Sequence, residues 1–74
     1  MGLPKIRLLQ FVRECGSVTS EDVASALGYT LPGAASMLLG LHKHGHLRRH
    51  RYDHAFVYIL SEKGDGYLNF VGAN

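Results

Sequence analysis

The stretch that decides the fold is GSVTSEDVASALGYTLPGAASMLLGLHKHG, residues 16–45. Glycine stands at both of its ends and at position 28, and glycine is a typical residue just past a helix end. Thr19 has the position of a helix N-cap, and Asp22 follows three residues later, where a capping box needs its acceptor. Thr30 is a second N-cap of the same kind. The stretch predicts two consecutive helices, residues 20–27 and 31–44.

The apolar residues of this stretch recur at helical spacing. Val23, Ala24, Ala26 and Leu27 are expected to form the buried side of the first helix, and Ala34, Met37, Leu38 and Leu41 that of the second. A helix of eight residues, a short turn and a longer helix have the spacing of a helix-turn-helix.

Another amphipathic helix is predicted upstream, over residues 4–15. Pro4 suits a first helical turn and Gly16 suits a helix end. Its apolar face consists of Ile6, Leu8, Leu9, Phe11, Val12 and Cys15. We therefore interpret Cys15 as a core residue rather than a redox sensor.

After Gly45 the pattern changes to that of a β-hairpin, predicted over residues 46–60, with its turn at residues 52–54. Phe56, Tyr58 and Leu60 share one face of the second strand and Val57 and Ile59 share the other. Both faces are apolar, so the pattern leaves the buried face undecided. Residues 61–66 are expected to break the strand, and the apolar residues 67–71 to form a short helix or strand within a tail of residues 61–74.

Length and charge limit the classes of protein that the chain can represent. Its 74 residues suffice for one domain, predicted over 1–74, and its single cysteine excludes an internal disulfide. The formal net charge is only +2, but four of the eight Lys and Arg lie between Lys43 and Arg51, and no acid lies between Asp22 and Asp53. No signal peptide or membrane span is visible, so we expect a cytoplasmic protein without a membrane partner.

The ordered set of these segments resembles the winged helix-turn-helix superfamily, and most closely its MarR-like and ArsR-like regulators. The resemblance rests on residues 16–28, on Ala35 to Leu41, on Gly45-His46-Leu47-Arg48-Arg49, and on Tyr58-Ile59-Leu60-Ser61-Glu62-Lys63-Gly64. It implies an α+β fold in which a three-helix bundle carries a C-terminal β-hairpin, the wing. It also implies a transcription regulator that binds double-stranded DNA, with helix 31–44 in the major groove and the wing on the backbone or in the minor groove.

The expected DNA-binding residues lie in that helix and in the wing. They are Thr30, Gly33, Ser36, Lys43, Arg48, Arg49, His50, Arg51 and His54. Alternate residues of a strand face opposite sides, so Arg49 and Arg51 are not expected to share a face with Arg48 and His50. The alternative interpretation is that the wing cations are only solvated and keep the protein soluble, because charged residues are common on protein surfaces.

The second helix of the predicted helix-turn-helix departs from the family pattern. The related regulators place Arg, Gln, Asn or Lys at the positions that meet bases, whereas here only Thr30 and Ser36 carry hydrogen-bonding side chains there. Leu31 and Leu39 form an apolar patch on that helix, which suits a partner protein or packs under the tail. A protein-interaction adaptor that does not bind DNA is therefore the alternative function.

Other classes of site find little support in the sequence. No nucleophile–base pair, phosphate loop or paired carboxylates are present, so no enzyme and no cofactor are expected. The five histidines lack the convergent spacing of a metal site and are interpreted as exposed imidazoles near phosphate, which predicts stronger DNA binding at pH 6 than at pH 8. No small-molecule ligand is expected. The resemblance implies a homodimer, for which the apolar chain ends, Leu3 and Tyr67 to Val71, are the candidate surfaces.

Overall fold

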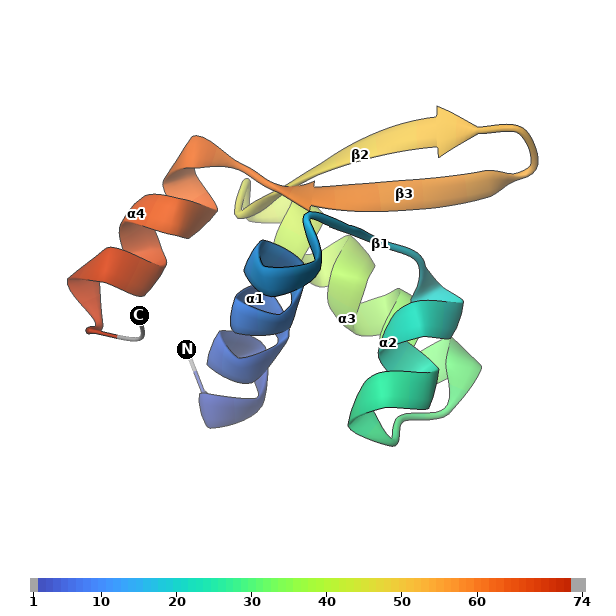
Figure 1. Cartoon of the computed structure of the whole chain (residues 1–74), viewed down its shortest axis with the longest axis horizontal. Coiled ribbons are helices and arrows are strands. Elements are labelled where there is room, and N and C mark those ends of the chain that lie inside the picture. The colour runs from blue at the N-terminus through green and yellow to red at the C-terminus, as the bar shows by residue number, and fades with distance from the viewer. Residues whose placement is uncertain (1, 73–74) are drawn as a thin grey trace.

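The computed structural model describes residues 2–72, so Met1, Ala73 and Asn74 of the predicted unit 1–74 lie outside the described residues. Its elements, shown in Figure 1, are α1 (Leu3–Cys15), β1 (Ser17–Val18), α2 (Ser20–Leu27), α3 (Leu31–Lys43), β2 (Leu47–Tyr52), β3 (Ala55–Leu60) and α4 (Glu62–Phe70). The three predicted helices and the hairpin are confirmed, with helix ends within one residue of their expected positions.

Local capping explains the bounds of the helix-turn-helix. The Asp22 N–H donates to Thr19 Oγ1 at 3.2 Å, and the Thr19 N–H donates to Asp22 Oδ2 at 2.9 Å, which is the predicted capping box. Gly28 ends α2 in the left-handed conformation at φ 75°. The Gly33 N–H then donates to Thr30 Oγ1 at 3.1 Å and begins α3. The chain direction bends by 116° between the two helices, which pack against each other.

A small antiparallel sheet lies across the helices, with strand order β1-β3-β2. Val18 pairs with Tyr58, which anchors the base of the wing to the chain segment between α1 and α2. The wing turns through Asp53 and His54, and Asp53 takes the left-handed conformation at φ 58° that Asp tolerates better than most residues. Beyond β1 the hairpin extends past the helices as a two-stranded arm (Figure 1).

The core lies between the helices and the inner face of the sheet. It consists of Leu8, Leu9, Val12, Val18, Val23, Ala34, Leu38, Leu41, Leu47, Tyr58 and Leu68. Two expectations about burial were wrong, because Cys15 and Ala26 are exposed. Cys15 is the last residue of α1, next to Gly16, which ends the helix.

For residues 67–71 the structure confirms a helix rather than a strand, but this helix, α4, begins five residues earlier than the expected segment. Residues 61–66 do end the strand, but they form the N-terminal cap and first turns of a helix rather than a loop. Ser61 is the N-cap, and its Oγ accepts the Gly64 N–H at 3.0 Å. Gly64 and Gly66 disfavour a helix locally, so the helix depends on tertiary contacts.

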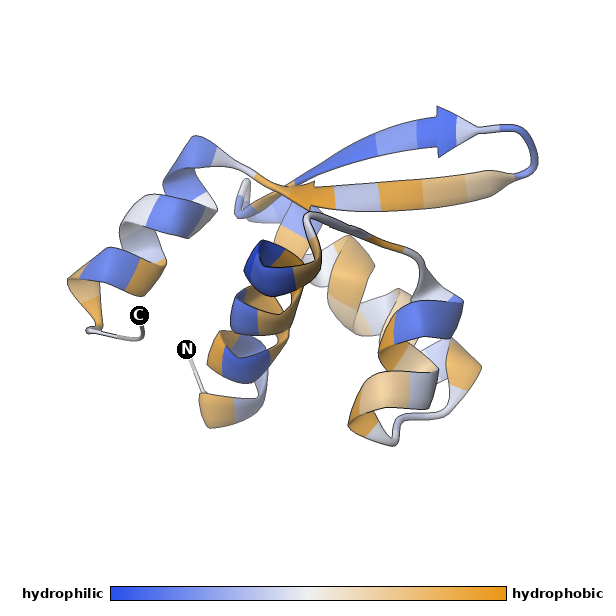
Figure 2. Ribbon diagram, in the orientation of Figure 1, coloured by the Kyte–Doolittle hydropathy of each residue, from blue (hydrophilic) through white to orange (hydrophobic). Residues whose placement is uncertain are grey.

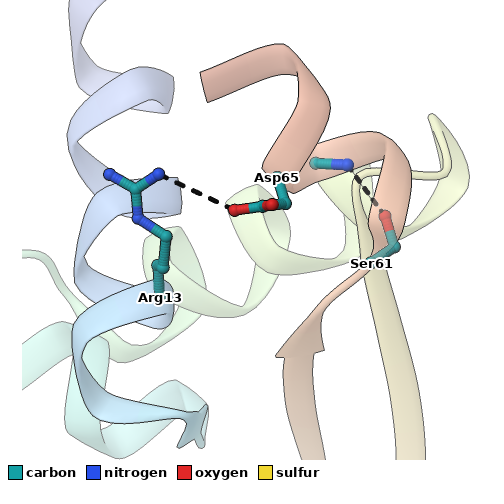
Figure 3. A network of polar contacts seen from close by, with 4 residues as sticks. Arg13, Ser61 and Asp65 are labelled. Carbon is teal, nitrogen blue, oxygen red and sulfur yellow. Dashed lines mark hydrogen bonds and ion pairs between the residues drawn. The ribbon is translucent and has the colours of Figure 1, made fainter. Parts of the chain in front are cut away.

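Those contacts attach α4 both to the turn between α3 and β2 and to α1. The Ser61 Oγ donates to the Gly45 carbonyl at 2.6 Å, the Ser61 N–H donates to the His46 carbonyl at 3.1 Å, and Lys63 Nζ donates to the His44 carbonyl at 2.9 Å. On the α1 side, Arg13 and Asp65 form an ion pair at 3.7 Å, which Figure 3 shows together with the Ser61 cap. The side chain of Leu68 completes the core, so α4 is an integral part of the fold.

No single helix within residues 2–72 is long and apolar enough to cross a membrane, although α2 and α3 together pass that test of length and composition as a bent pair.

Candidate nucleic-acid interface

The outward face of α3 is small and nearly uncharged. Ala34, Leu38 and Leu41 bury the opposite face, which leaves Pro32, Ser36 and Lys43 exposed. Thr30 is also exposed, at the N-cap. Its Oγ1 lies 3.0 Å from the position that a Cβ on Gly33 would take, so the predicted residues Thr30 and Gly33 form one tight helix start. The predicted α3 residues therefore lie together on the surface, but Lys43 is their only cation.

The register of the hairpin assigns each wing residue to one of two faces. It pairs Arg48 with Ile59, Arg49 with Tyr58, His50 with Val57 and Arg51 with Phe56. Tyr58 is 4% exposed and belongs to the core, so its face is the inner one, toward the helices. Arg49 and Arg51 lie on this inner face, and Arg48 and His50 on the outer one. This separation confirms the expectation from strand alternation.

The inner wing face and α3 enclose a groove of about 430 Å³. One wall is Leu31, Ala35 and Leu39 of α3, and the other includes Arg49 and Phe56 of the wing. The apolar patch of α3 therefore faces the wing, and the expectation that it packs under the tail was wrong, because α4 packs against α1 instead. The groove is continuous with the wing tip, where His54 also lines it.

Phe56 organises the cations of the inner face. The guanidinium carbon of Arg49 lies 4.2 Å from the centre of its ring, and that of Arg51 lies 5.9 Å from it. Both distances are within the range of cation–π attraction. Within residues 2–72 no carboxylate forms an ion pair with Arg49 or Arg51. The positive charge of both side chains is therefore available to an external anion.

The outer face and the wing tip differ in their surroundings. Arg48 and His50 line a second hollow, of about 550 Å³, together with Lys63 at the start of α4. At the tip, the His54 side chain is 94% exposed, and its Nε2 lies 3.7 Å from the Asp53 carboxylate. Figure 2 shows the contrast between the hydrophilic strand β2, which carries the cations, and the largely hydrophobic strand β3.

The five histidines do not share one environment, so their interpretation as uniformly exposed imidazoles was wrong. His46 is only 8% exposed, packs 5.3 Å from the Tyr67 ring, and has an Nδ1 without a hydrogen-bond partner. Burial, followed by the positive charges of Lys63, His44 and Lys5, lowers the pKa of His46 below its ordinary value. His42 is half-buried, with Nδ1 3.1 Å from the Leu47 carbonyl oxygen.

The histidines of the wing, His50 and His54, are both exposed. In the part of the chain that the structure describes, no three His, Cys, Asp or Glu side chains lie close enough together to hold a metal ion.

Two residues that matter for the site were not predicted. Phe56 was assigned to a strand face but not to the groove, because the alternating apolar pattern of β3 does not show which face meets the helices. Glu21 lines the groove from the start of α2. The sequence identified Glu21 only as an acid that favours a helix N-terminus.

Solved structures with a similar fold include MarR from E. coli and a MarR family protein from Bacillus stearothermophilus. The YusO protein from Bacillus subtilis matches with a TM-score of 0.90 and 16% sequence identity, over 99% of this chain and 54% of that chain. FabT from Streptococcus pneumoniae, solved in complex with DNA, matches with a TM-score of 0.88 and 18% identity, over 99% of this chain and 53% of that one. The oxidised form of MarR from E. coli gives a TM-score of 0.81 and 20% identity, over 89% and 48% of the two chains.

These likenesses confirm the winged helix-turn-helix fold of the MarR type. The chain spans about half the length of the three solved chains. No protein-family model matches the sequence, and no curated protein sequence matches it.

Proposed function

We propose that this protein binds double-stranded DNA as a small transcription regulator, with α3 in the major groove and the wing on the backbone or in the minor groove. The observation that carries the proposal concerns Arg49 and Arg51. Both lie on the wing face toward α3, and within residues 2–72 neither forms an ion pair with a carboxylate. Duplex DNA is a dense line of phosphates, and cations beside a groove-reading element are what it requires.

Each predicted contact residue has a place in this arrangement. In this arrangement α3 contacts the DNA through the hydroxyl and backbone groups of Thr30, Gly33 and Ser36. The ammonium group of Lys43 contacts it at the end of the helix. Arg49, Arg51 and His54 face the DNA from the inner side and tip of the wing. Arg48 and His50 contact phosphates from the outer side. The proposal contains no catalytic step and no cofactor.

The first experiment is fluorescence anisotropy of a labelled 20–30 base-pair duplex of random sequence, titrated at several salt concentrations. We expect micromolar or tighter binding that weakens as salt rises, with a slope that reports the number of neutralised phosphates. The double variant Arg49→Ala/Arg51→Ala should reduce that slope by about 2. Arg7→Ala removes a cation from the exposed side of α1 and is the control that should leave binding nearly unchanged. Absence of binding at low salt would end the proposal.

One observation supports the alternative of a protein-binding adaptor. Leu31 and Phe56, which are 50% and 42% exposed, line the same groove and would suit an apolar side chain of a partner. Under this alternative, arginine-to-alanine changes in the wing leave activity intact, whereas Leu31→Ser abolishes it. The two functions therefore predict opposite results from the same set of variants.

We also propose that the chain ends form a homodimer surface. Leu3, Phe70 and Val71 are exposed apolar residues on α1 and the end of α4, which pack against each other. Leu68, which falls in the expected surface, belongs to the core and is not available. Phe70→Lys should convert a dimer to a monomer in sedimentation equilibrium. A wild-type chain that is monomeric at millimolar concentration would contradict this proposal.

A further inference from the structure

The ring of Phe56 lies on the inner wing face beside two arginine side chains. It is 42% exposed, and it contacts two guanidinium groups from the neighbouring strand rather than the hydrophobic core. A guanidinium that stacks on a ring uses its flat face, so all five of its in-plane N–H donors stay free for an external acceptor. A cation–π contact of this kind leaves the hydrogen-bonding capacity of the cation free.

Restraint matters because free arginine side chains lose conformational freedom when they bind. Immobilising a long side chain at an interface lowers affinity about two- to tenfold, and pre-ordering it in the free protein removes part of that loss. Arg49, at 4.2 Å, is held more closely than Arg51, at 5.9 Å. Arg48 lies on the opposite face and has no such contact.

The exposed face of α3 differs from the wing, because it carries few side chains that can form hydrogen bonds with base edges. Its exposed side chains near the N-terminus are Leu31, Pro32 and Ser36, and its only cation lies at the last residue, Lys43. Discrimination between base pairs in the major groove depends mainly on bidentate contacts from Arg, Lys, Asn or Gln. The first three turns of α3 contain none of these residues.

We propose that Phe56 is a positioning residue that holds Arg49 and Arg51 as an ordered pair, and that this pair, rather than α3, makes the protein prefer A·T-rich duplexes with a narrow minor groove. A narrow minor groove has an enhanced negative potential that attracts arginine, whereas the exocyclic amino group of guanine obstructs the groove floor. The inference rests on the proposed binding of duplex DNA and specifies which duplexes bind best.

Glu21 is compatible with this arrangement. It lines the same groove from the N-terminus of α2 but forms no ion pair with Arg49. Its negative charge disfavours phosphates on the α2 side of the groove. The DNA backbone is therefore directed toward the wing arginines.

The test compares three labelled duplexes of equal length in the anisotropy assay: an A-tract, a G·C-rich duplex, and the same G·C-rich duplex with inosine in place of guanine. Inosine removes the minor-groove amino group and leaves the major-groove edge unchanged. We expect the wild type to bind the A-tract and the inosine duplex about tenfold more tightly than the guanine duplex. Equal binding to all three duplexes would overturn the inference while leaving the proposed function intact.

Variants then test the role of Phe56 itself. Phe56→Leu should lower affinity for the A-tract about three- to tenfold and remove most of the preference, because two arginine side chains that are no longer pre-ordered must be immobilised on binding. The salt slope should not change, because both cations remain. Phe56→Tyr keeps an aromatic ring and should retain the wild-type preference, and Arg7→Ala, on the exposed side of α1, should leave that preference unchanged.

A second variant keeps the inference testable if Phe56→Leu folds poorly. Arg49→Lys keeps the charge but loses the planar group that stacks, so it should lose the preference with an unchanged salt slope. A preference that survives in both variants would refute the role of Phe56. Failure of the wild type to bind any of the three duplexes would refute the proposed function instead.

Discussion

The replacement of Gly64 by alanine should separate local helix propensity from tertiary packing in α4. Gly64 is buried against the turn between α3 and β2. A Cβ built there meets the His46 carbonyl oxygen closer than any real contact, and it lies 2.8 Å from Leu60 Cδ1 and 3.1 Å from the His46 carbonyl carbon. The backbone carbonyl cannot rotate away like a side chain, so α4 and the turn must separate.

The cost follows from the contacts that such a separation breaks. A shift of roughly 1 Å would stretch the bond from the Ser61 N–H to the His46 carbonyl, now 3.1 Å, beyond hydrogen-bonding distance. It would also weaken the bond from the Ser61 hydroxyl to the Gly45 carbonyl. Overpacking costs about 1–3 kcal/mol and each lost hydrogen bond about 1 kcal/mol. Alanine returns about 1 kcal/mol through its helix propensity, which leaves a net loss of about 1–4 kcal/mol.

Gly66 is the matched control, because it lies in the same helix and a Cβ there meets nothing within 4 Å. Gly66→Ala should therefore stabilise the protein by up to about 1 kcal/mol. The measurement is urea unfolding followed by circular dichroism at 222 nm, with equal slopes required for the comparison. If Gly64→Ala proved as stable as the wild type, or if both variants lost stability equally, the packing argument would be wrong.

Three further predictions concern single groups. Glu21→Gln should tighten binding to any duplex by about two- to threefold at low salt and by less at high salt, as anisotropy titrations would show, because it removes a negative charge from the groove. The fold lowers the pKa of His46, so as the pH falls the unfolded chain binds the proton before the folded chain does. The His46 contribution to the free energy of unfolding should be constant above about pH 6.5 and fall toward pH 5, by at most about 1.4 kcal/mol per pH unit. Urea midpoints measured against pH should therefore give a flatter profile for His46→Gln. Thr19→Ala removes the α2 cap and should cost about 0.5–2 kcal/mol in urea unfolding, whereas Ser25→Ala, at an exposed position of the same helix, should cost nothing.

Much of the fold could be predicted because its signals are local. Thr19 and Thr30 bind backbone groups only three residues away, and a glycine follows α1 and α2 directly. Such interactions need no partner from elsewhere in the chain, so the residue order alone contains them. The alternation of the wing cations was predictable for the same reason.

The candidate site was predicted only in part. The sequence located the basic residues but could not show that Arg49 and Arg51 face α3, because both faces of β3 are apolar and a strand pattern does not identify the covered face. Phe56 became part of the site only through its place opposite Arg51 in the register. The burial of His46 was equally invisible, since it depends on α4 and Tyr67 packing over it.

By itself the sequence determined the positions of α1, α2 and α3, the presence of a hairpin and the sign of its charge. These properties depend on caps, helix stops and periodicity within a few residues. Tertiary structure alone decided that the tail is a helix beginning at Glu62, that Cys15 is exposed, and that the wing arginines and the apolar side of α3 share one groove. Each of these outcomes depends on contacts between residues far apart in the chain, where packing overrides local preference, as it does for the glycine-containing helix α4.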